Sequence, residues 1–420
     1  NRIGTLENGV WQRMTNTAAS VQGMDSRRLA AIDAFLKARY LDTGLLPNAQ
    51  LLIAREGEIV HFSHQGAARE GGGTVDQRSL FRIASMTKPI TSIAFMMLVE
   101  EGKVAVDTPV HHILPEFRGL GVYNGGGGGV PFVTRPTSEP MRMLDLLRHT
   151  SGLTYGFSGG DALARIYAEQ GLDFDAHDGT LAEVCARLGQ APLDHHPGAR
   201  WTYGVSIDVL GHLVEVISGQ TFDLYLRDHI FAPLGMHDTF FEVPANRLDR
   251  FVPCYDQAPD NGIARSDGTT DSPFASGVTC FSGGGGLLST MNDYLRFADM
   301  LRGGGELDGE RILGRRTVDY MATNHMPGDG DLTTMGQEVF SETSYAGIGF
   351  GLGVSVVLDP AAAQTMSSPG EFAWGGMAST AFWIDPAEDM AVVFLTQLIP
   401  SGSYPLRREL RVLVNQALVD

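Results

Sequence analysis

Apolar residues recur along the chain at two different periods, and these periods predict a mixture of helices and strands. Between residues 25 and 40, Leu29, Ile32 and Leu36 recur at helical spacing behind an Asp/Ser start, which predicts an amphipathic helix. Two apolar runs follow at 50–54 and 58–63, on either side of a turn that contains Gly57. This pattern is typical of a β-hairpin, so we expect a sheet to begin here.

The next predicted helix, at 85–101, is apolar on nearly every side and stops at Gly102, a residue suited to a left-handed cap. A helix of this kind must be buried. From about residue 104 to 280 the pattern changes to helices, including 181–188 and 207–218, separated by long polar and glycine-rich loops such as 125–129. We interpret this stretch as an inserted, mainly helical domain.

Strand-like runs return in the last quarter of the chain, at 349–358, 372–374, 380–384 and 390–395. A final helical pattern covers 406–418. Helices at both ends of the chain around an antiparallel sheet predict an α+β fold. We expect a discontinuous α/β sandwich domain at 24–103 and 281–420, and the inserted helical domain at 104–280.

Composition narrows the class of protein. The chain has 420 residues, of which 43% are hydrophobic and 19% charged, a balance that can bury a sizeable core and is not that of a disordered polypeptide. Its formal net charge of −18 repels phosphate backbones and anionic lipid surfaces at long range. We therefore expect neither nucleic acid nor a membrane as a partner, and the sequence leaves the oligomeric state open.

Cysteine usage and hydropathy bear on location. The three cysteines, Cys185, Cys254 and Cys280, are far apart and form no zinc-binding pattern. No stretch reaches the ~18 uninterrupted apolar residues of a membrane-spanning helix, and residues 1–23 lack the apolar centre of a signal peptide. We expect a cytoplasmic protein, with the native N-terminus left open because the chain begins with Asn1 rather than Met.

The strongest local signal for chemistry is Ser85-Met86-Thr87-Lys88, at the start of the predicted buried helix. Residues three apart lie on one helical face, so Ser85 and Lys88 bring a hydroxyl and an amine together. A Ser hydroxyl is a poor nucleophile until a neighbour takes its proton, and burial favours the neutral lysine that can do so. Pro89 disfavours helical geometry at Lys88, so we expect a locally distorted helix start.

Together with Trp201-Thr202-Tyr203 far downstream, this motif resembles the serine β-lactamase and penicillin-binding-protein superfamily. Three further segments resemble its class C-like branch in matching order, at 147–153, 233–236 and 285–290. The resemblance spans roughly residues 25 to 400 and implies a β-lactamase-like fold. It also implies that Tyr203 is the third catalytic group, a phenol that exchanges a proton with the nucleophile and with the leaving group. Whether Lys88 or Tyr203 is the base stays open, because interacting titratable groups share protons as a unit.

Two departures from the β-lactamase pattern bear on the substrate. Val205 stands where the pattern has the Asn of Tyr-x-Asn, and Trp374-Gly375-Gly376 stands where it has Lys-Thr-Gly. The loss of an amide and a cation favours a neutral, more apolar substrate than a β-lactam. Trp-Gly-Gly at this place resembles the family VIII carboxylesterases, which implies substrate contacts at Trp374, Gly375 and Gly376. The resemblance also implies an oxyanion hole made by the backbone N–H groups of Ser85 and Met377.

Other candidate motifs are weaker. Residues 156–160 match the G-x-S-x-G nucleophile elbow around Ser158, but they follow a loop rather than an apolar strand, so we interpret the match as accidental. The glycine run at 125–129 lacks the Lys-Ser/Thr ending of a phosphate loop. The pairs His111-His112 and His195-His196 consist of adjacent residues that point apart, so we expect no metal site.

The sequence therefore predicts a serine carboxylesterase that hydrolyses short- to medium-chain carboxylic esters through a Ser85 acyl-enzyme, with Lys88 and Tyr203 as the acid/base device. We expect a small-molecule ester as substrate and no cofactor. One alternative is a β-lactamase or D-alanyl carboxypeptidase of the same fold. Another is a catalytically silent, penicillin-binding-like protein.

Overall fold

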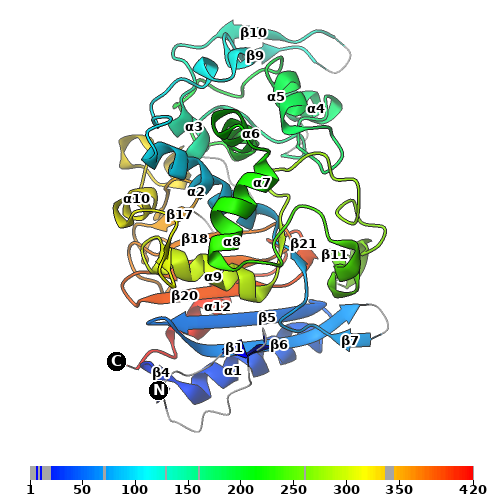
Figure 1. Ribbon diagram of the computed structural model, residues 1–420, viewed down its shortest axis with the longest axis vertical. Helices are drawn as coiled ribbons and strands as arrows, with labels where there is room; N and C mark the ends of the chain where they lie inside the picture. The colour runs from blue at the N-terminus through cyan, green and yellow to red at the C-terminus, as the bar shows by residue number, and fades with distance from the viewer. Residues whose placement is uncertain are drawn as a thin grey trace.

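The structure is a computed structural model that describes residues 6–7, 10–11, 20–69, 72–127, 130–158, 161–259, 262–335 and 345–419. An eight-stranded sheet, antiparallel throughout, crosses the lower half of the molecule in Figure 1. In spatial order its strands are β16 (Ile348–Phe350), β17 (Ser355–Val357), β18 (Phe372–Gly375), β19 (Ala381–Asp385), β20 (Met390–Leu395), β5 (Asn48–Arg55), β6 (Glu58–Arg69) and β7 (Gly72–Thr74).

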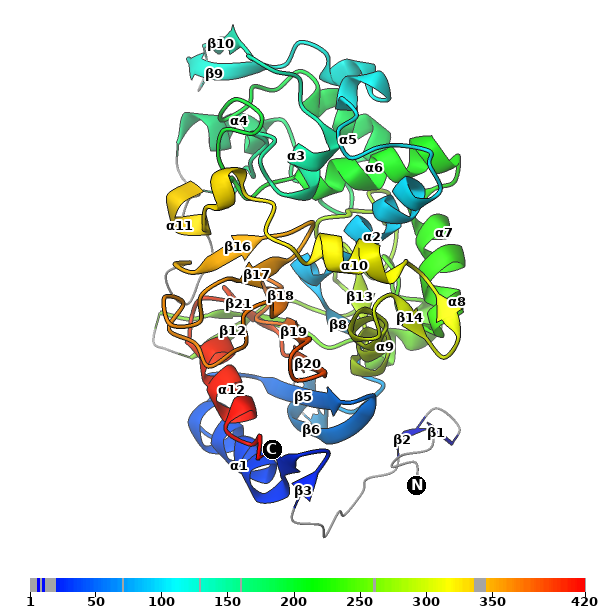
Figure 2. The ribbon, with the colours of Figure 1, turned by 90° about the vertical axis from the view of Figure 1, so that its left-hand side faces the viewer.

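Both faces of the sheet are covered by helices. In β5, Leu51 and Ile53 belong to one apolar core, whereas Leu52 and Ala54 belong to the core on the opposite face. This alternation explains why the central strands read as continuous apolar runs. The first core lies under α1 (Ser26–Leu36), its π-helical continuation Lys37–Leu41, and α12 (Leu406–Asn415); the second lies under α2 (Thr87–Glu100) and α9 (Met291–Arg302) (Figure 2).

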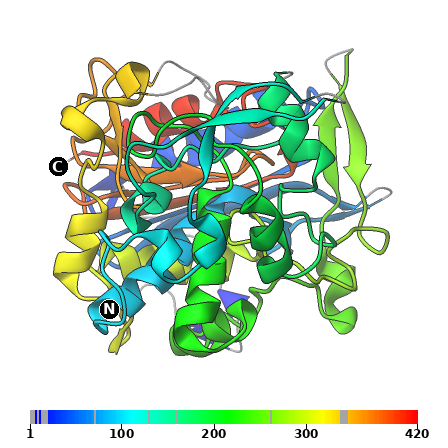
Figure 3. The ribbon, with the colours of Figure 1, turned by 90° about the horizontal axis from the view of Figure 1, so that it is seen from above.

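The middle of the chain forms the other half of the molecule, at the top of Figure 1. Its central helix, α6 (Ser206–Ser218), packs against α2, so that α2 lies between the sheet and the helical half. Seen from above, these helical segments lie over the strands (Figure 3). α6 also contacts α3 (Met143–Leu147), α5 (Leu181–Leu188) and α7 (Phe222–Leu226). The same region contains α4 (Ala162–Glu169) and α8 (Ala232–Leu234).

Smaller elements connect the two halves. β8 (Phe81–Arg82) pairs with β13 (Leu288–Ser289), and β11 (Cys254–Gln257) pairs with both β12 (Ile263–Asp267) and β21 (Leu398–Ile399). The other elements are β1 (Leu6–Glu7), β2 (Val10–Trp11), β3 (Ser20–Val21), β4 (Met24–Asp25), β9 (Gly121–Gly125), β10 (Val133–Pro136), β14 (Glu306–Leu307), β15 (Glu310–Arg311), α10 (Arg315–Met321), α11 (Leu332–Met335), the π-helix Arg227–Phe231 and the short 3-10 helices Val110–His112, Pro115–Phe117, Ala245–Arg250 and Pro327–Asp329.

The predicted antiparallel sheet flanked by helices is confirmed, with differences in detail. The run at 349–358 is not one strand but β16 and β17 joined by a turn, in which Gly353 has a φ of +86°. A Cβ at Gly353 would lie 2.2 Å from Ser92 Oγ, so only glycine lets this turn pack on α2. The middle region contains strands as well as helices, and its predicted domain boundaries stay a prediction. Gly128 and Gly129 lie outside the described residues.

Candidate active site

Ser85 lies on a short 3-10 turn, Ala84–Met86, that runs directly into α2. The turn is strained, because Ala84 has a φ of +45°, which costs a non-glycine residue on the order of 1–3 kcal/mol. Ser85 is half-buried at the inner end of a cleft. The 3-10 turn precedes Lys88 and Pro89, which both lie within α2, so the distortion that we expected Pro89 to cause at Lys88 is not seen.

Lys88 lies one turn further along, and its side chain is completely buried. Its Nζ donates three hydrogen bonds, to Ser85 Oγ at 3.1 Å, Tyr155 OH at 2.9 Å and the Gly284 carbonyl at 2.6 Å. Three oxygen atoms thus surround Nζ. The structure therefore brings Ser85 and Lys88 into the contact that their spacing predicts.

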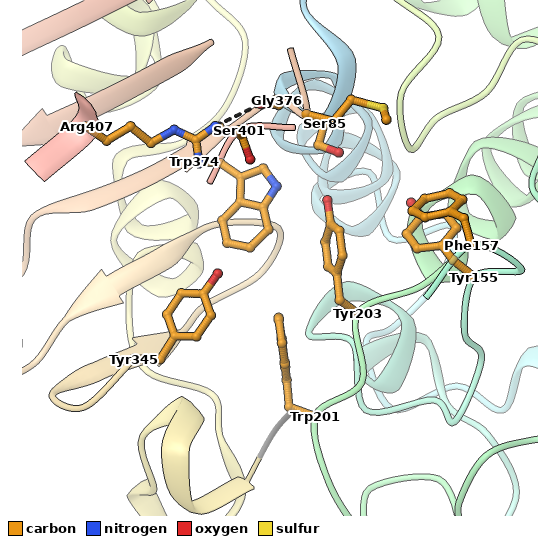
Figure 4. Close-up of a pocket in the computed structure, with 12 residues that line it drawn as sticks. Ser85, Tyr155, Phe157, Trp201, Tyr203, Tyr345, Trp374, Gly376, Ser401 and Arg407 are labelled. Carbon is orange, nitrogen blue, oxygen red and sulfur yellow. Dashed lines mark hydrogen bonds between the residues drawn. The ribbon is translucent and has the colours of Figure 1, made fainter. Parts of the chain in front are cut away.

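Tyr203 faces the same point from the helical half of the molecule. Its hydroxyl points toward Ser85 in Figure 4, and its ring centroid lies 4.6 Å from Lys88 Nζ. The segment is fixed by neighbouring hydrogen bonds, from Thr202 N to the His149 carbonyl at 2.9 Å and from Trp201 N to the Met335 carbonyl at 2.7 Å. The phenol of Tyr203, distant in the chain, thus converges with the Ser85 hydroxyl and the Lys88 amine at one end of the cleft.

Tyr155 is a contact that the sequence analysis missed. Within the described part of the chain, the phenol that is hydrogen-bonded to Lys88 is that of Tyr155 and not that of Tyr203. Burial, and then the charges of Tyr203 and Asp208, hold the pKa of Tyr155 well above its usual 10, so its phenol stays neutral. Its position five residues after Thr150, in a loop, gave no periodic or motif signal for this role.

The end of β18 approaches the Ser85 turn closely. A Cβ at Gly376 would lie 2.3 Å from Thr380 Oγ1 and 2.5 Å from the Ile83 carbonyl, so the approach requires glycine. Arg407 of α12 holds this turn by donating from Nη2 to the Gly376 carbonyl at 2.8 Å and the Thr380 carbonyl at 2.9 Å. Met377, next in the chain, lines the cleft beside Ser85.

The two residues expected to form the oxyanion hole, Ser85 and Met377, both line the cleft. Among the turn, loop and cap hydrogen bonds of the described residues, neither the Ser85 N–H nor the Met377 N–H is a donor. Two unoccupied N–H groups at one cleft are what an oxyanion requires. The placement of Ser85 and Met377 is thus compatible with the predicted oxyanion hole.

The cleft itself has a volume of about 550 Å³, including its opening to solvent, and its walls are largely aromatic (Figure 4). Trp374 lies across from Tyr203, with ring centroids 5.5 Å apart, and its buried indole Nε1 has no hydrogen-bond partner among the described residues. Tyr155 and Phe157 stack at 4.5 Å on the other side, and Phe157 is 52% exposed. The lining residues are Ser85, Tyr155, Phe157, Trp201, Tyr203, Tyr345, Trp374, Gly375, Gly376, Met377, Ser401 and Arg407.

The competing motifs lie elsewhere. Ser158 follows the stacked Phe157 on a loop, as predicted, and does not line the cleft. Gly159 and Gly160, which complete that motif, lie outside the described residues. No three His, Cys, Asp or Glu side chains in the described ranges are grouped so as to hold a metal ion. Within the same ranges, no helix combines the length and the apolar character needed to cross a membrane.

The fold and the Ser-x-x-Lys geometry define the class of protein, a serine hydrolase, and comparison with known proteins gives the family. The Beta-lactamase family model matches residues 32–416, and the chain belongs to this family.

Two curated relatives are similar over most of their length. Protein Rv1367c of Mycobacterium tuberculosis is 36% identical over 86% of this chain and 88% of its own. Esterase EstB of Burkholderia gladioli is 33% identical over 94% of this chain and 98% of its own. Among solved structures, EstCE1, a hydrolase with promiscuous acyltransferase activity, superposes with a TM-score of 0.76 at 24% identity, over 93% of this chain and 99% of that one, and so shares the fold.

Proposed function

We propose that this member of the Beta-lactamase family is a serine carboxylesterase that hydrolyses short- to medium-chain carboxylic esters through a Ser85 acyl-enzyme. The observation that carries the proposal is the 3.1 Å hydrogen bond between Lys88 Nζ and Ser85 Oγ at the inner end of an aromatic cleft. A serine hydroxyl needs a neighbour that takes its proton, and the buried Lys88 lies in reach. The similarity to esterase EstB over nearly the whole chain supports the same reaction class.

These placements support the following reaction. Ser85 Oγ attacks the ester carbonyl carbon, and its proton passes to the acid/base device formed by Lys88 and Tyr203. The N–H groups of Ser85 and Met377 would donate to the oxyanion that develops. The device then returns a proton to the departing alkoxide, which leaves as an alcohol. Water attacks the acyl-enzyme, gives one proton to the device and releases the carboxylic acid, and the proton returns to Ser85.

The cleft wall favours an ester over a β-lactam. A β-lactam carries a carboxylate, which a cation or amide near the nucleophile would hold, and Trp374 and Val205 occupy the two places where the β-lactamase pattern has these groups. The indole of Trp374 offers a carboxylate no charge, and Arg407, the cation that lines the cleft, already donates from Nη2 to the Gly376 and Thr380 carbonyls, so burying a carboxylate here would cost free energy. A neutral ester with an apolar acyl chain would lose little on entering the same space.

Initial-rate kinetics test the assignment. We expect nitrophenyl esters of two to eight acyl carbons to be hydrolysed with a kcat/KM at least ~100-fold above that for a chromogenic cephalosporin. Ser85→Ala should abolish ester hydrolysis, while the control Ser158→Ala leaves it largely intact. A cephalosporin preference would make the chain a lactam-hydrolysing enzyme, the opposite serine pattern would make Ser158 the nucleophile, and inactivity toward both substrates would indicate a silent binding protein.

Acyl transfer to an alcohol is a second candidate. The stacked pair Tyr155 and Phe157 gives the cleft an apolar wall that extends to its exposed rim, where an alcohol would compete with water for the acyl-enzyme. EstCE1, which shares the fold, is described as having promiscuous acyltransferase activity. The test is a reaction of a vinyl ester in water that contains benzyl alcohol. Acyl transfer predicts the benzyl ester as a product. If the carboxylic acid is the only product, the protein hydrolyses the ester and does not transfer its acyl group.

A further inference from the structure

A buried carboxylate lies behind the catalytic lysine and is linked to it through the backbone N–H and C=O groups of a single glycine, Gly284. Asp208, in the first turn of α6, is 1% exposed, and its Oδ1 accepts hydrogen bonds from Ser282 Oγ at 2.5 Å and from Gly284 N at 2.8 Å. The carbonyl of Gly284 in turn accepts the 2.6 Å hydrogen bond from Lys88 Nζ. The carboxylate and the amine therefore bind the two polar groups of one glycine.

The segment that carries this glycine is held tightly between α2 and α6. Thr91 Oγ1 donates to the Gly283 carbonyl at 2.7 Å, and Gly285 N donates to Ser282 Oγ at 3.0 Å. A Cβ at Gly284 would lie 2.2 Å from Asp208 Oδ2. Only glycine therefore fits against the Asp208 carboxylate at this position.

Asp208 is costly for the fold to bury. Its Oδ2 has no hydrogen-bond partner within the described residues, and burial raises the pKa of its carboxyl to about 6, against the lowering effects of Lys88, Ser282 and Gly284. The titratable groups that interact with Asp208 are Lys88 of α2, Tyr155, Asp173, Cys185 of α5 and Cys280. Lys88 is the cation among them.

We propose that Asp208 is a positioning residue for Lys88: it holds the Gly284 carbonyl on Nζ, and its charge stabilises the ammonium that forms when Lys88 takes the Ser85 proton. This inference rests on the proposed acid/base role of Lys88. The negative charge of Asp208, on the far side of Gly284, attracts the positive charge that develops at Nζ during the attack. The proton lost by Ser85 resides on Nζ until the leaving alkoxide takes it.

The test is the pH dependence of kcat/KM for a nitrophenyl ester in Asp208→Asn, which keeps the shape and the acceptor oxygen but removes the charge. We expect the acidic limb of the profile to move to lower pH by about one unit, and kcat on the plateau to fall ~10-fold with KM within ~3-fold. If Asp208 only supported the fold, its replacement would not shift the acidic limb of the pH profile. It would also not lower kcat selectively while KM stays nearly constant.

Asp293 provides a matched control. It also lies in the first turn of a helix, α9, is buried with its pKa raised to about 6, and accepts from Asp238 N at 2.7 Å and Thr239 Oγ1 at 2.9 Å. Asp293→Asn should leave the acidic limb in place. An Asp208→Asn limb that is unmoved, that moves to higher pH, or that moves equally in Asp293→Asn would overturn the inference.

A third variant separates this inference from the function it rests on. If Lys88→Ala keeps wild-type activity, the acid/base proposal itself fails. If Lys88→Ala is inactive while Asp208→Asn has a wild-type profile, only the role of Asp208 fails. Asp208→Ala, which also removes the acceptor of Gly284 N, should reduce kcat further than Asp208→Asn; equal kcat values would contradict the positioning of the Gly284 carbonyl.

Discussion

At the scale of single residues, the sequence predicted the pair that is closest in the chain and missed the contact that depends on tertiary structure. Ser85 and Lys88 are three residues apart at a helix start, so local geometry alone brings them together. Tyr203 came from the resemblance, because the 114 positions between Lys88 and Tyr203 carry no spacing rule. Tyr155 had neither kind of signal, since its contact with Lys88 exists only after the loop before α4 has packed on α2.

The two tyrosines should differ in their effects on catalysis. Tyr203→Phe removes the phenol that points toward Ser85, so we expect kcat to fall by ~100-fold or more. Tyr155→Phe removes one of three acceptors around Lys88 Nζ but no proton donor to the substrate, so we expect a fall of ~10-fold. Steady-state kinetics on one nitrophenyl ester give both values. A larger loss of kcat in Tyr155→Phe than in Tyr203→Phe would make Tyr155, and not Tyr203, the phenol that exchanges the proton.

At the scale of elements, apolar periodicity located the central strands and helices but not their ends. The buried strands β5, β19 and β20 were recognisable because both faces are covered and nearly every position is apolar. β16 and β17 were predicted as one strand, because the turn at Gly353 is dictated by contact with Ser92 of α2, which the local pattern does not contain. The hairpin of β9 and β10 was missed because its residues are mostly polar or glycine.

The end of β18 gives a prediction at this scale. Gly376→Ala places a methyl group against Thr380 Oγ1 and the Ile83 carbonyl, so the strand end must move away from the Ser85 turn. We expect about 1–3 kcal/mol less stability and, because the Met377 N–H moves with it, a kcat reduced ~100-fold. Urea unfolding and ester kinetics measure the two effects. A stably folded variant with wild-type kcat would show that this strand end does not serve the oxyanion.

At the scale of the whole molecule, the site lies where the sheet, α2 and the helical half meet, and its polar groups are buried in an apolar core. Such groups affect folding as well as catalysis. His149 is fully buried beside Tyr203, with ring centroids 4.9 Å apart, and burial, followed by the charge of Lys88, holds its pKa well below 6.5. Asp208 and Asp293 have the opposite shift, from 3.8 to about 6.

These shifts have opposite consequences for stability. His149 is neutral in the folded state, so its contribution is lost as pH falls below 6.5, where the unfolded chain binds the proton, with a slope of up to about 1.4 kcal/mol per pH unit. The two aspartates stabilise the fold at low pH and cease to do so as pH rises through about 6. The effect of His149 must therefore be measured as a difference between variants.

We expect His149→Phe, which keeps an aromatic ring against Tyr203, to lose less unfolding free energy than the wild type between pH 7.5 and pH 5.0. Chemical denaturation at the two pH values provides the comparison. Identical losses in both proteins would show that His149 takes up no proton on unfolding in this range.

The central claim is that Lys88 activates Ser85 for nucleophilic attack, and the most direct measurement is the rate at which a fluorophosphonate labels the intact protein, followed by mass spectrometry with peptide mapping. We predict one adduct per chain, on Ser85, formed at least ~100-fold more slowly in Lys88→Ala and unchanged in Ser158→Ala. An adduct on any other residue, or equal labelling rates with and without Lys88, would contradict the account.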